Sequence, residues 1–109
     1  MKTTAVAAFH RPPENLNCAQ AVLAAYHDAT GDRTLPIAAL KPCGGGRAPD
    51  GLCGALHAAC VLAPDRADAI KAAFLARIGA LRCKEIEAPC LDCVGTAAGL
   101  LEQTTPPKA

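Results

Sequence analysis

The sequence predicts an all-α fold, a compact bundle of about four to five helices in which a glycine-rich loop carries a set of cysteines. Two observations predict this fold. Apolar side chains recur at helical spacing in every long segment, and no run alternates apolar and polar residues as a half-buried strand would. At 109 residues the chain is expected to be one domain, 1–109, with flexible ends at 1–14 and 103–109.

The first half of the chain predicts one long helix, one short helix and a loop. The long helix is expected over about 15–29, with Asn15 or Asn17 as its cap. A short helix or turn is expected over 35–40. The next segment, 41–51, holds four Gly and two Pro among eleven residues, a composition typical of a loop.

The second half predicts three further helices. One begins at 52 or 53 and ends at 63, and a second covers 65–78 and ends at a glycine. A connector that contains Cys83 follows. Pro89 then precedes a last helix over about 90–101.

Composition excludes several classes of partner. The net charge is +1, from 11 basic and 10 acidic side chains, so the chain has no basic footprint for nucleic acid. Phe9, Phe74 and Tyr26 are the only aromatic residues, which leaves no stacking surface for bases. No stretch approaches the roughly 20 apolar residues of a membrane span.

The expected location is the cytoplasm. The apolar run from Ala5 to Phe9 is too short for a signal peptide, and His10-Arg11-Pro12-Pro13 ends it. The core must be built from aliphatic side chains, many of them alanine, which bury little area each. A bound cofactor, or a second copy in a homodimer, could add the stability that such a core lacks.

Seven cysteines in so short a chain indicate chemistry more than structural bridges. An odd number cannot pair completely within one chain, and an Ala- and Leu-rich helical chain can form a core without disulfides. In the cytoplasm thiols stay reduced, so dense cysteines favour metal binding or redox work.

Cys53 is the strongest single candidate. It lies between Gly51 and Gly54, at the expected start of a helix, where backbone N–H groups and the positive helix end favour a thiolate. The flanking glycines allow the backbone to come close to a ligand. The alternative is a small cysteine that packs between helices.

A CxxC pair and one histidine are further candidates. Cys90 and Cys93 lie three positions apart, so both sulfurs face one side of a helix and can reach one ligand or each other. His57 follows Cys53 by one helical turn, where it could bind the same metal or stabilise the thiolate; alternatively it is a surface residue.

The other cysteines are less informative by position alone. Cys18 lies early in the first long helix and Cys83 in the connector. Cys43 belongs to the glycine loop and is expected to be the most exposed, whereas Cys60 is expected to pack in the core.

Nearly the whole chain, about residues 15 to 102, resembles the family of small redox-active proteins named for a C…GCAxxG…C…C pattern. The resemblance rests on the order and spacing of several short motifs together. These are Asn17-Cys18-Ala19-Gln20-Ala21-Val22, Gly44-Gly45-Gly46, Cys53-Gly54-Ala55, Phe74 with Gly79 and Cys83, and Cys90 ahead of Ala97-Ala98 and Leu100-Leu101-Glu102.

The resemblance implies a helical fold in which four cysteines converge: Cys18, Cys53, Cys83 and Cys90. By the same resemblance, the remaining three are additions: Cys43, Cys60 and Cys93. Where the family pattern has its second glycine this chain has Ala58, the next smallest residue, which keeps close helix packing possible.

The leading interpretation is electron transfer through an iron–sulfur cluster, with an unidentified redox protein as partner. Its expected ligands are Cys18, Cys53, Cys83 and Cys90, with Cys93, Cys43 and His57 as further metal-ligand candidates. The loop Gly44-Gly45-Gly46 is expected to form one wall of the site, where its backbone amides could bond to cluster sulfurs.

Two other interpretations remain open. A thiol–disulfide protein without a cofactor would use Cys53 as nucleophile, and Cys18, Cys83 or Cys90 would resolve the mixed disulfide. The third is a zinc-holding or partner-binding helical module.

Overall fold

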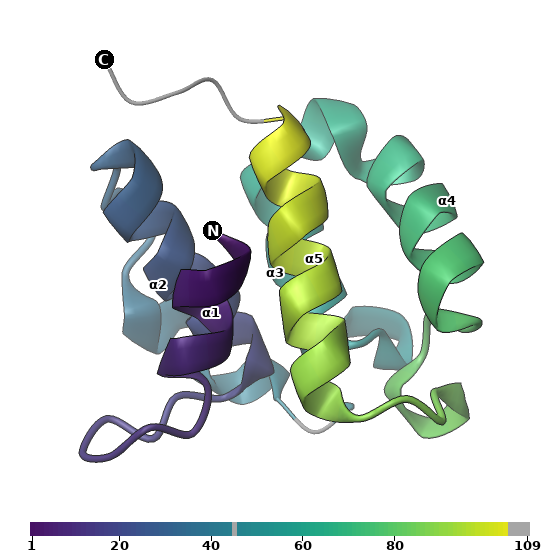
Figure 1. The fold of residues 1–109 in the computed structure, drawn as a ribbon, viewed down its shortest axis with the longest axis horizontal. Helices are drawn as coiled ribbons and strands as arrows, with labels where there is room; N and C mark the ends of the chain where they lie inside the picture. Colours follow the sequence, from purple (N-terminus) through teal and green to yellow (C-terminus); the bar gives the residue numbers. More distant parts are fainter. Residues whose placement is uncertain (45, 105–109) are drawn as a thin grey trace.

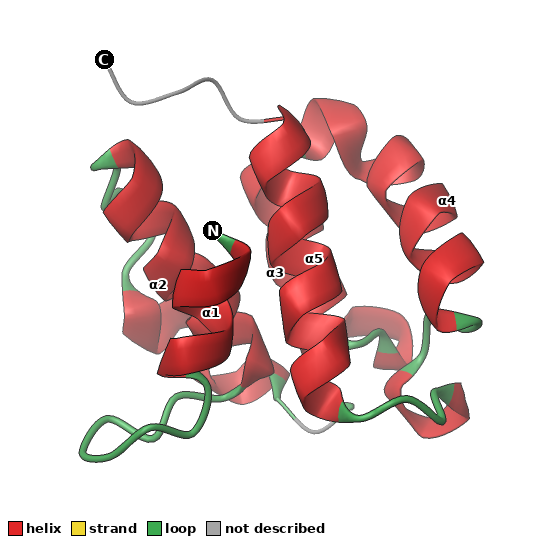
Figure 2. Cartoon of the chain, in the orientation of Figure 1, coloured by secondary structure: helices red, strands yellow, loops and turns green. Residues whose placement is uncertain are grey.

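The computed structural model describes residues 1–44 and 46–104, and it confirms the all-α prediction. Its α-helices are α1 (Lys2–Ala8), α2 (Cys18–Thr30), α3 (Gly54–Leu62), α4 (Ala67–Ile78) and α5 (Cys90–Thr104). Short 3-10 helices are η1 (Ile37–Cys43), η2 (Pro49–Gly51), η3 (Pro64–Arg66) and η4 (Cys83–Glu85). Across the described ranges there is no strand (Figure 2).

Helix α2 begins later than the sequence suggested because Asn17 is its cap. The Asn17 side chain accepts a hydrogen bond from the Gln20 backbone N–H (2.8 Å), and the Gln20 side chain accepts one from the Asn17 N–H (3.1 Å). This reciprocal pair satisfies two amides at the helix start. Asn15 instead has a positive φ of 51°, so it cannot belong to the helix.

The first fourteen residues are not simply the flexible segment expected from the sequence, because Lys2–Ala8 form α1. This helix packs against α5 and α2, and Ala5 is fully buried between them. Gly95 of α5 permits the approach: a Cβ there would lie 3.2 Å from Lys2 Cε and 3.3 Å from Val6 Cγ2. The contact is therefore set by a small residue about ninety positions away, which local sequence patterns cannot reveal.

Helix α3 lies behind α5 in the view of Figure 1 and packs against α2, α4 and α5. Leu56 is its one large buried side chain; the other buried residues are small, and Ala55, Ala58 and Ala59 are fully enclosed. Ala58 is thus a small, fully buried residue of the helix interior. Helix α4 contributes Phe74 to the core, whereas Leu75 is 46% exposed.

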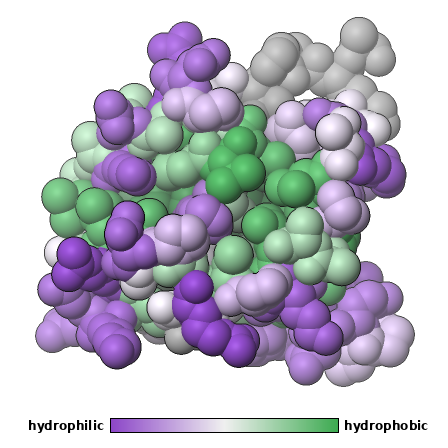
Figure 3. Space-filling view, turned by 180° about the vertical axis from the view of Figure 1, so that it is seen from behind, coloured by the Kyte–Doolittle hydropathy of each residue, from purple (hydrophilic) through white to green (hydrophobic). Residues whose placement is uncertain are grey.

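None of the helices within the described ranges is both long and apolar enough to cross a membrane. The face opposite to that of Figure 1 shows apolar surface surrounded by hydrophilic side chains (Figure 3). Large hydrophobic side chains that are exposed include Val61 on α3 and Leu91 on α5.

Candidate cysteine site

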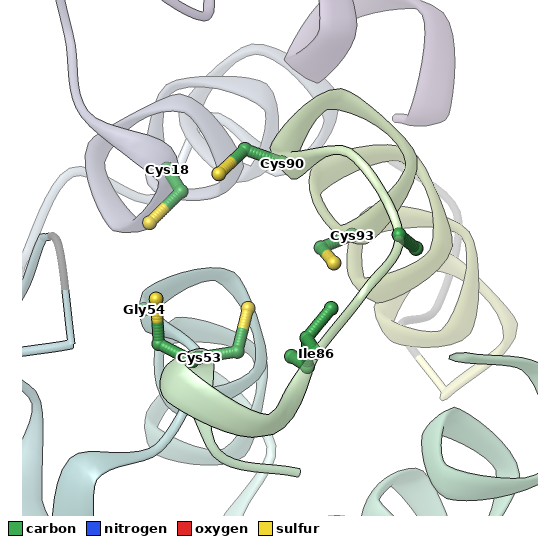
Figure 4. A pocket seen from close by; sticks show the side chains of 8 residues that line it. Cys18, Cys53, Gly54, Ile86, Cys90 and Cys93 are labelled. Atoms are coloured by element: carbon green, nitrogen blue, oxygen red, sulfur yellow. The ribbon is translucent and has the colours of Figure 1, made fainter. Parts of the chain in front are cut away.

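Five cysteines line one small cavity of about 80 Å³. Figure 4 shows the labelled cysteines around its central space. The lining residues are Cys18, Cys53, Gly54, Cys83, Ile86, Ala88, Cys90 and Cys93. The four cysteines that the resemblance implies to converge therefore line one cavity, together with Cys93.

Each of the four expected cysteines stands at the start of a helical segment. Cys18 and Cys90 are the first residues of α2 and α5, Cys53 is the residue immediately before α3, and Cys83 begins η4. The amino-terminal ends of three α-helices thus point at one cavity. Such ends carry partial positive charge and amides without intrahelical partners, so together they favour an anionic occupant.

A backbone pairing brings the connector to the cavity. Leu52 and Arg82 form an isolated antiparallel bridge, and the Cys53 N–H donates a hydrogen bond to the Leu81 carbonyl at 2.9 Å. The segment that precedes Cys83 therefore runs beside the segment that precedes α3. This pairing places Cys83 next to Cys53 despite the thirty positions between them.

Gly54 gives the site its close packing. A Cβ on Gly54 would lie 2.5 Å from the Cys43 carbonyl oxygen and 2.6 Å from Cys18 Sγ. Both distances are far below van der Waals contact, so any side chain here would push Cys18 or the loop away. The close approach that flanking glycines predicted is therefore present on the Gly54 side.

The glycine loop borders the site without lining the cavity in its described part. Gly46, with φ of 81°, lies behind Cys83: a Cβ there would be 3.4 Å from Cys83 Cβ. Gly44 lies against the Asn17 side chain at the start of α2, where a Cβ would be 2.9 Å from that side chain. Gly45 lies outside the described residues. Gly44 and Gly46 therefore pack against Asn17 and Cys83 outside the cavity. They do not form the cavity wall that the sequence predicted.

Burial decides the protonation of Cys53. Removal from water raises the pKa of its thiol to about 12, although the backbone amides of Leu56 and Ala55 act in the opposite direction. The side chain is 5% exposed. The expected thiolate at Cys53 is thus wrong for the cofactor-free chain, because the cost of desolvation exceeds the gain from the helix start.

Cys93 also lines the cavity, although the sequence predicted it only as a further metal-ligand candidate. It is 3% exposed, burial raises the pKa of its thiol, and the Cys53 side chain acts as its hydrogen-bond partner. Its spacing from Cys90 was the available signal, since positions three apart share a helix face. The apolar rim of Ile86 and Ala88 had no sequence signal.

The other candidates lie away from the cavity lining. Cys60 faces the start of α4, where its Sγ donates to the Ala67 carbonyl at 3.8 Å, in line with the expected packing role. Burial, with a contribution from nearby Lys71, lowers the pKa of His57. Neither His57 nor Cys43 is among the lining residues, so neither joins the other thiols as a ligand candidate.

The cavity thiols surround a space and do not meet at a point. Within residues 1–44 and 46–104, no group of three or more His, Cys, Asp or Glu side chains stands close enough to hold a single metal ion. All seven cysteines, each within those ranges, are thiols and not disulfides. A single ion would need sulfurs about 2.3 Å from one centre, whereas a cluster of several atoms is held from around its edge.

Comparisons with protein families, curated proteins and solved structures found no match to this chain.

Proposed function

We propose that this chain is a small redox protein that transfers electrons through an iron–sulfur cluster. Its ligands would be Cys18, Cys53, Cys83 and Cys90. The observation that carries the proposal is the cavity itself, where these four thiols come from four different elements and surround one space. Four cysteine thiolates are the usual ligand set of [2Fe–2S] and [4Fe–4S] clusters.

The chemistry of the surroundings fits such a group. The donors are sulfur only, and the rim residues Ile86 and Ala88 are apolar, which limits water near the site. The amino-terminal ends of α2, α3 and α5 favour the negative charge that a thiolate-bound cluster carries. When bound, the cluster would supply one-electron transfer.

The chain's own residues would release protons on metal uptake, position the ligands and expose one edge of the site. Metal coordination would displace the proton that burial keeps on Cys53, so uptake should release protons. Gly54 would hold Cys18 close to the start of α3. Cys90 is exposed, so one edge of the site reaches the surface, where a redox partner could approach.

The competing interpretations have weaker support. A cysteine that attacks the disulfides of other molecules needs a lowered pKa and an open approach, whereas Cys53 is buried and its pKa is raised. A structural zinc ion needs three or four ligands that converge on one point, and the described side chains do not converge in this way. We further propose a reducing compartment, the cytoplasm, because seven cysteines cannot pair completely within one chain and thiols stay available there for a cofactor.

The test is purification under anaerobic conditions, with iron and acid-labile sulfide counted per chain. The proposal expects both in comparable amounts, together with visible absorption that dithionite bleaches and air restores. A chain without iron and sulfide even after reconstitution would overturn the proposal. Stoichiometric zinc in their place would establish the zinc-holding module.

A further inference from the structure

Five thiols line the cavity, and a cluster needs four of them. Cys93 is the thiol that the proposed function leaves unused. It is among the most enclosed residues of the site and opens into the same cavity. A buried thiol beside a cofactor site has a chemical consequence, because it can react with a ligand thiol whenever the cofactor is absent.

The partner available to Cys93 is Cys53. Helices α3 and α5 pack against each other, with Cys53 at the start of one and Cys93 in the first turn of the other. The Cys53 side chain acts as hydrogen-bond partner of Cys93. Both side chains project toward the central space in Figure 4. The two thiols therefore line the same small cavity, at the interface between α3 and α5.

We propose that Cys53 and Cys93 form a reversible disulfide in the cofactor-free chain, and that this bond closes the site to cluster loading. Only the second part rests on the proposed function. Glutathione disulfide is the oxidant. Its S–S bond breaks, the Cys53–Cys93 bond forms, and the two thiol protons pass to two molecules of glutathione. The chain loses two electrons and glutathione disulfide gains them.

Cys90 is the entry point, since a tripeptide cannot reach the two buried thiols directly. Cys90 is exposed and lies one turn before Cys93 on α5. Its thiolate attacks glutathione disulfide, which forms a mixed disulfide and releases one glutathione. Cys93 then attacks the Cys90 sulfur and releases the second. Cys53 finally attacks the Cys93 sulfur, which returns Cys90 to a thiol.

The first test maps the bond. The full chain, reduced and freed of metal with a chelator, is incubated anaerobically with glutathione disulfide and then alkylated. We expect a mass loss of two hydrogens and a peptide pair that joins Cys53 to Cys93. Cys90→Ser should give the same pair about tenfold more slowly. The attack on glutathione disulfide must then begin at Cys18 or Cys83, which are less exposed than Cys90. In Cys93→Ser the pair cannot form, and a glutathione adduct should persist.

Other results of the mapping would overturn the proposal. These are a final bond between Cys90 and Cys93, a chain that carries only glutathione adducts, or Cys90→Ser that reacts as fast as the parent.

The second test separates this proposal from the proposed function. Iron and sulfide are offered to the reduced and to the oxidised parent chain. We expect uptake only by the reduced chain, and recovery of the oxidised chain after dithiothreitol. Equal uptake by both would overturn the closure of the site while leaving the cluster intact. No uptake by the reduced chain would overturn the proposed function, and the mapped disulfide would still stand on its own.

Discussion

At the residue scale, Gly54 determines how closely the cysteines can gather. It is the first residue of α3, and the space that a side chain would need is taken by Cys18 Sγ and the Cys43 carbonyl. Gly51 was expected to serve the same purpose on the other flank of Cys53. It has a φ of 72° and nothing within 4 Å of its would-be Cβ, so its role is to turn the chain.

Gly54→Ala should therefore destabilise the protein and disturb the site together. We expect a loss of about 1–3 kcal/mol in the free energy of unfolding, from overpacking, and lower iron content. Urea unfolding and an iron assay measure these effects. Gly99→Ala is the matched control, since its Cβ would meet no atom within 4 Å in the interior of α5. It should stabilise the helix by about 0.5–1 kcal/mol and leave iron content unchanged. Equal effects of the two substitutions would contradict the steric account of Gly54.

The raised pKa of Cys53 predicts a loss of stability in alkali for the cofactor-free chain. An ordinary thiol ionises at 9.0, whereas burial moves the pKa of Cys53 to about 12. Between these values the unfolded chain releases its proton and the folded chain does not, so the free energy of unfolding falls as pH rises. The expected loss is about 1.4 kcal/mol at about pH 10.

Urea unfolding between neutral pH and about pH 10 measures this loss. Cys53→Ser should lose less over the same range. It should retain part of the dependence, because burial also raises the pKa values of Cys93 and Cys60. A parent chain with constant stability over this range would show that Cys53 is not enclosed as described.

At the element scale, the sequence predicts the long helices well, but it predicts poorly the contacts between segments that are far apart in the sequence. Helices α3, α4 and α5 lie within a few residues of their predicted bounds, because apolar spacing and helix-stop residues are local signals. Helix α1 was missed because it packs on α5 beside Gly95, a contact between segments far apart in the sequence. Only the family resemblance predicted that four distant cysteines would lie around one site: Cys18, Cys53, Cys83 and Cys90. No local sequence pattern reports contacts between distant residues.

In the glycine loop, Gly46 packs against Cys83, the first residue of η4. Gly46→Val would place a branched side chain against Cys83 and also in a left-handed conformation that costs about 1–2 kcal/mol. Gly79→Val is the control, with φ of 95° and nothing within 4 Å of its Cβ. Both variants should lose stability, but only Gly46→Val should lower iron content and change the alkylation rate of Cys83. If Gly79→Val changes both as much, the loop has no specific role at the site.

At the scale of the whole molecule, the site lies where three helices begin, so the fold and the cofactor should depend on each other. The core is rich in alanine, and α3 meets its neighbours through fully buried Ala55, Ala58 and Ala59. Such side chains bury little apolar area each. A cluster that joins α2, α3, η4 and α5 would add links between these elements.

The cysteines around the cavity, and not cysteines in general, are proposed to hold the cofactor. The most direct test compares iron and sulfide per chain in Cys53→Ser and Cys60→Ser, both purified anaerobically with the parent. Cys53 lines the cavity, whereas Cys60 faces the start of α4. We predict that Cys53→Ser loses the iron and sulfide while its far-UV circular dichroism stays helical, because serine cannot replace a soft sulfur ligand. Cys60→Ser should match the parent. Equal losses from both variants, or full retention in Cys53→Ser, would contradict the account.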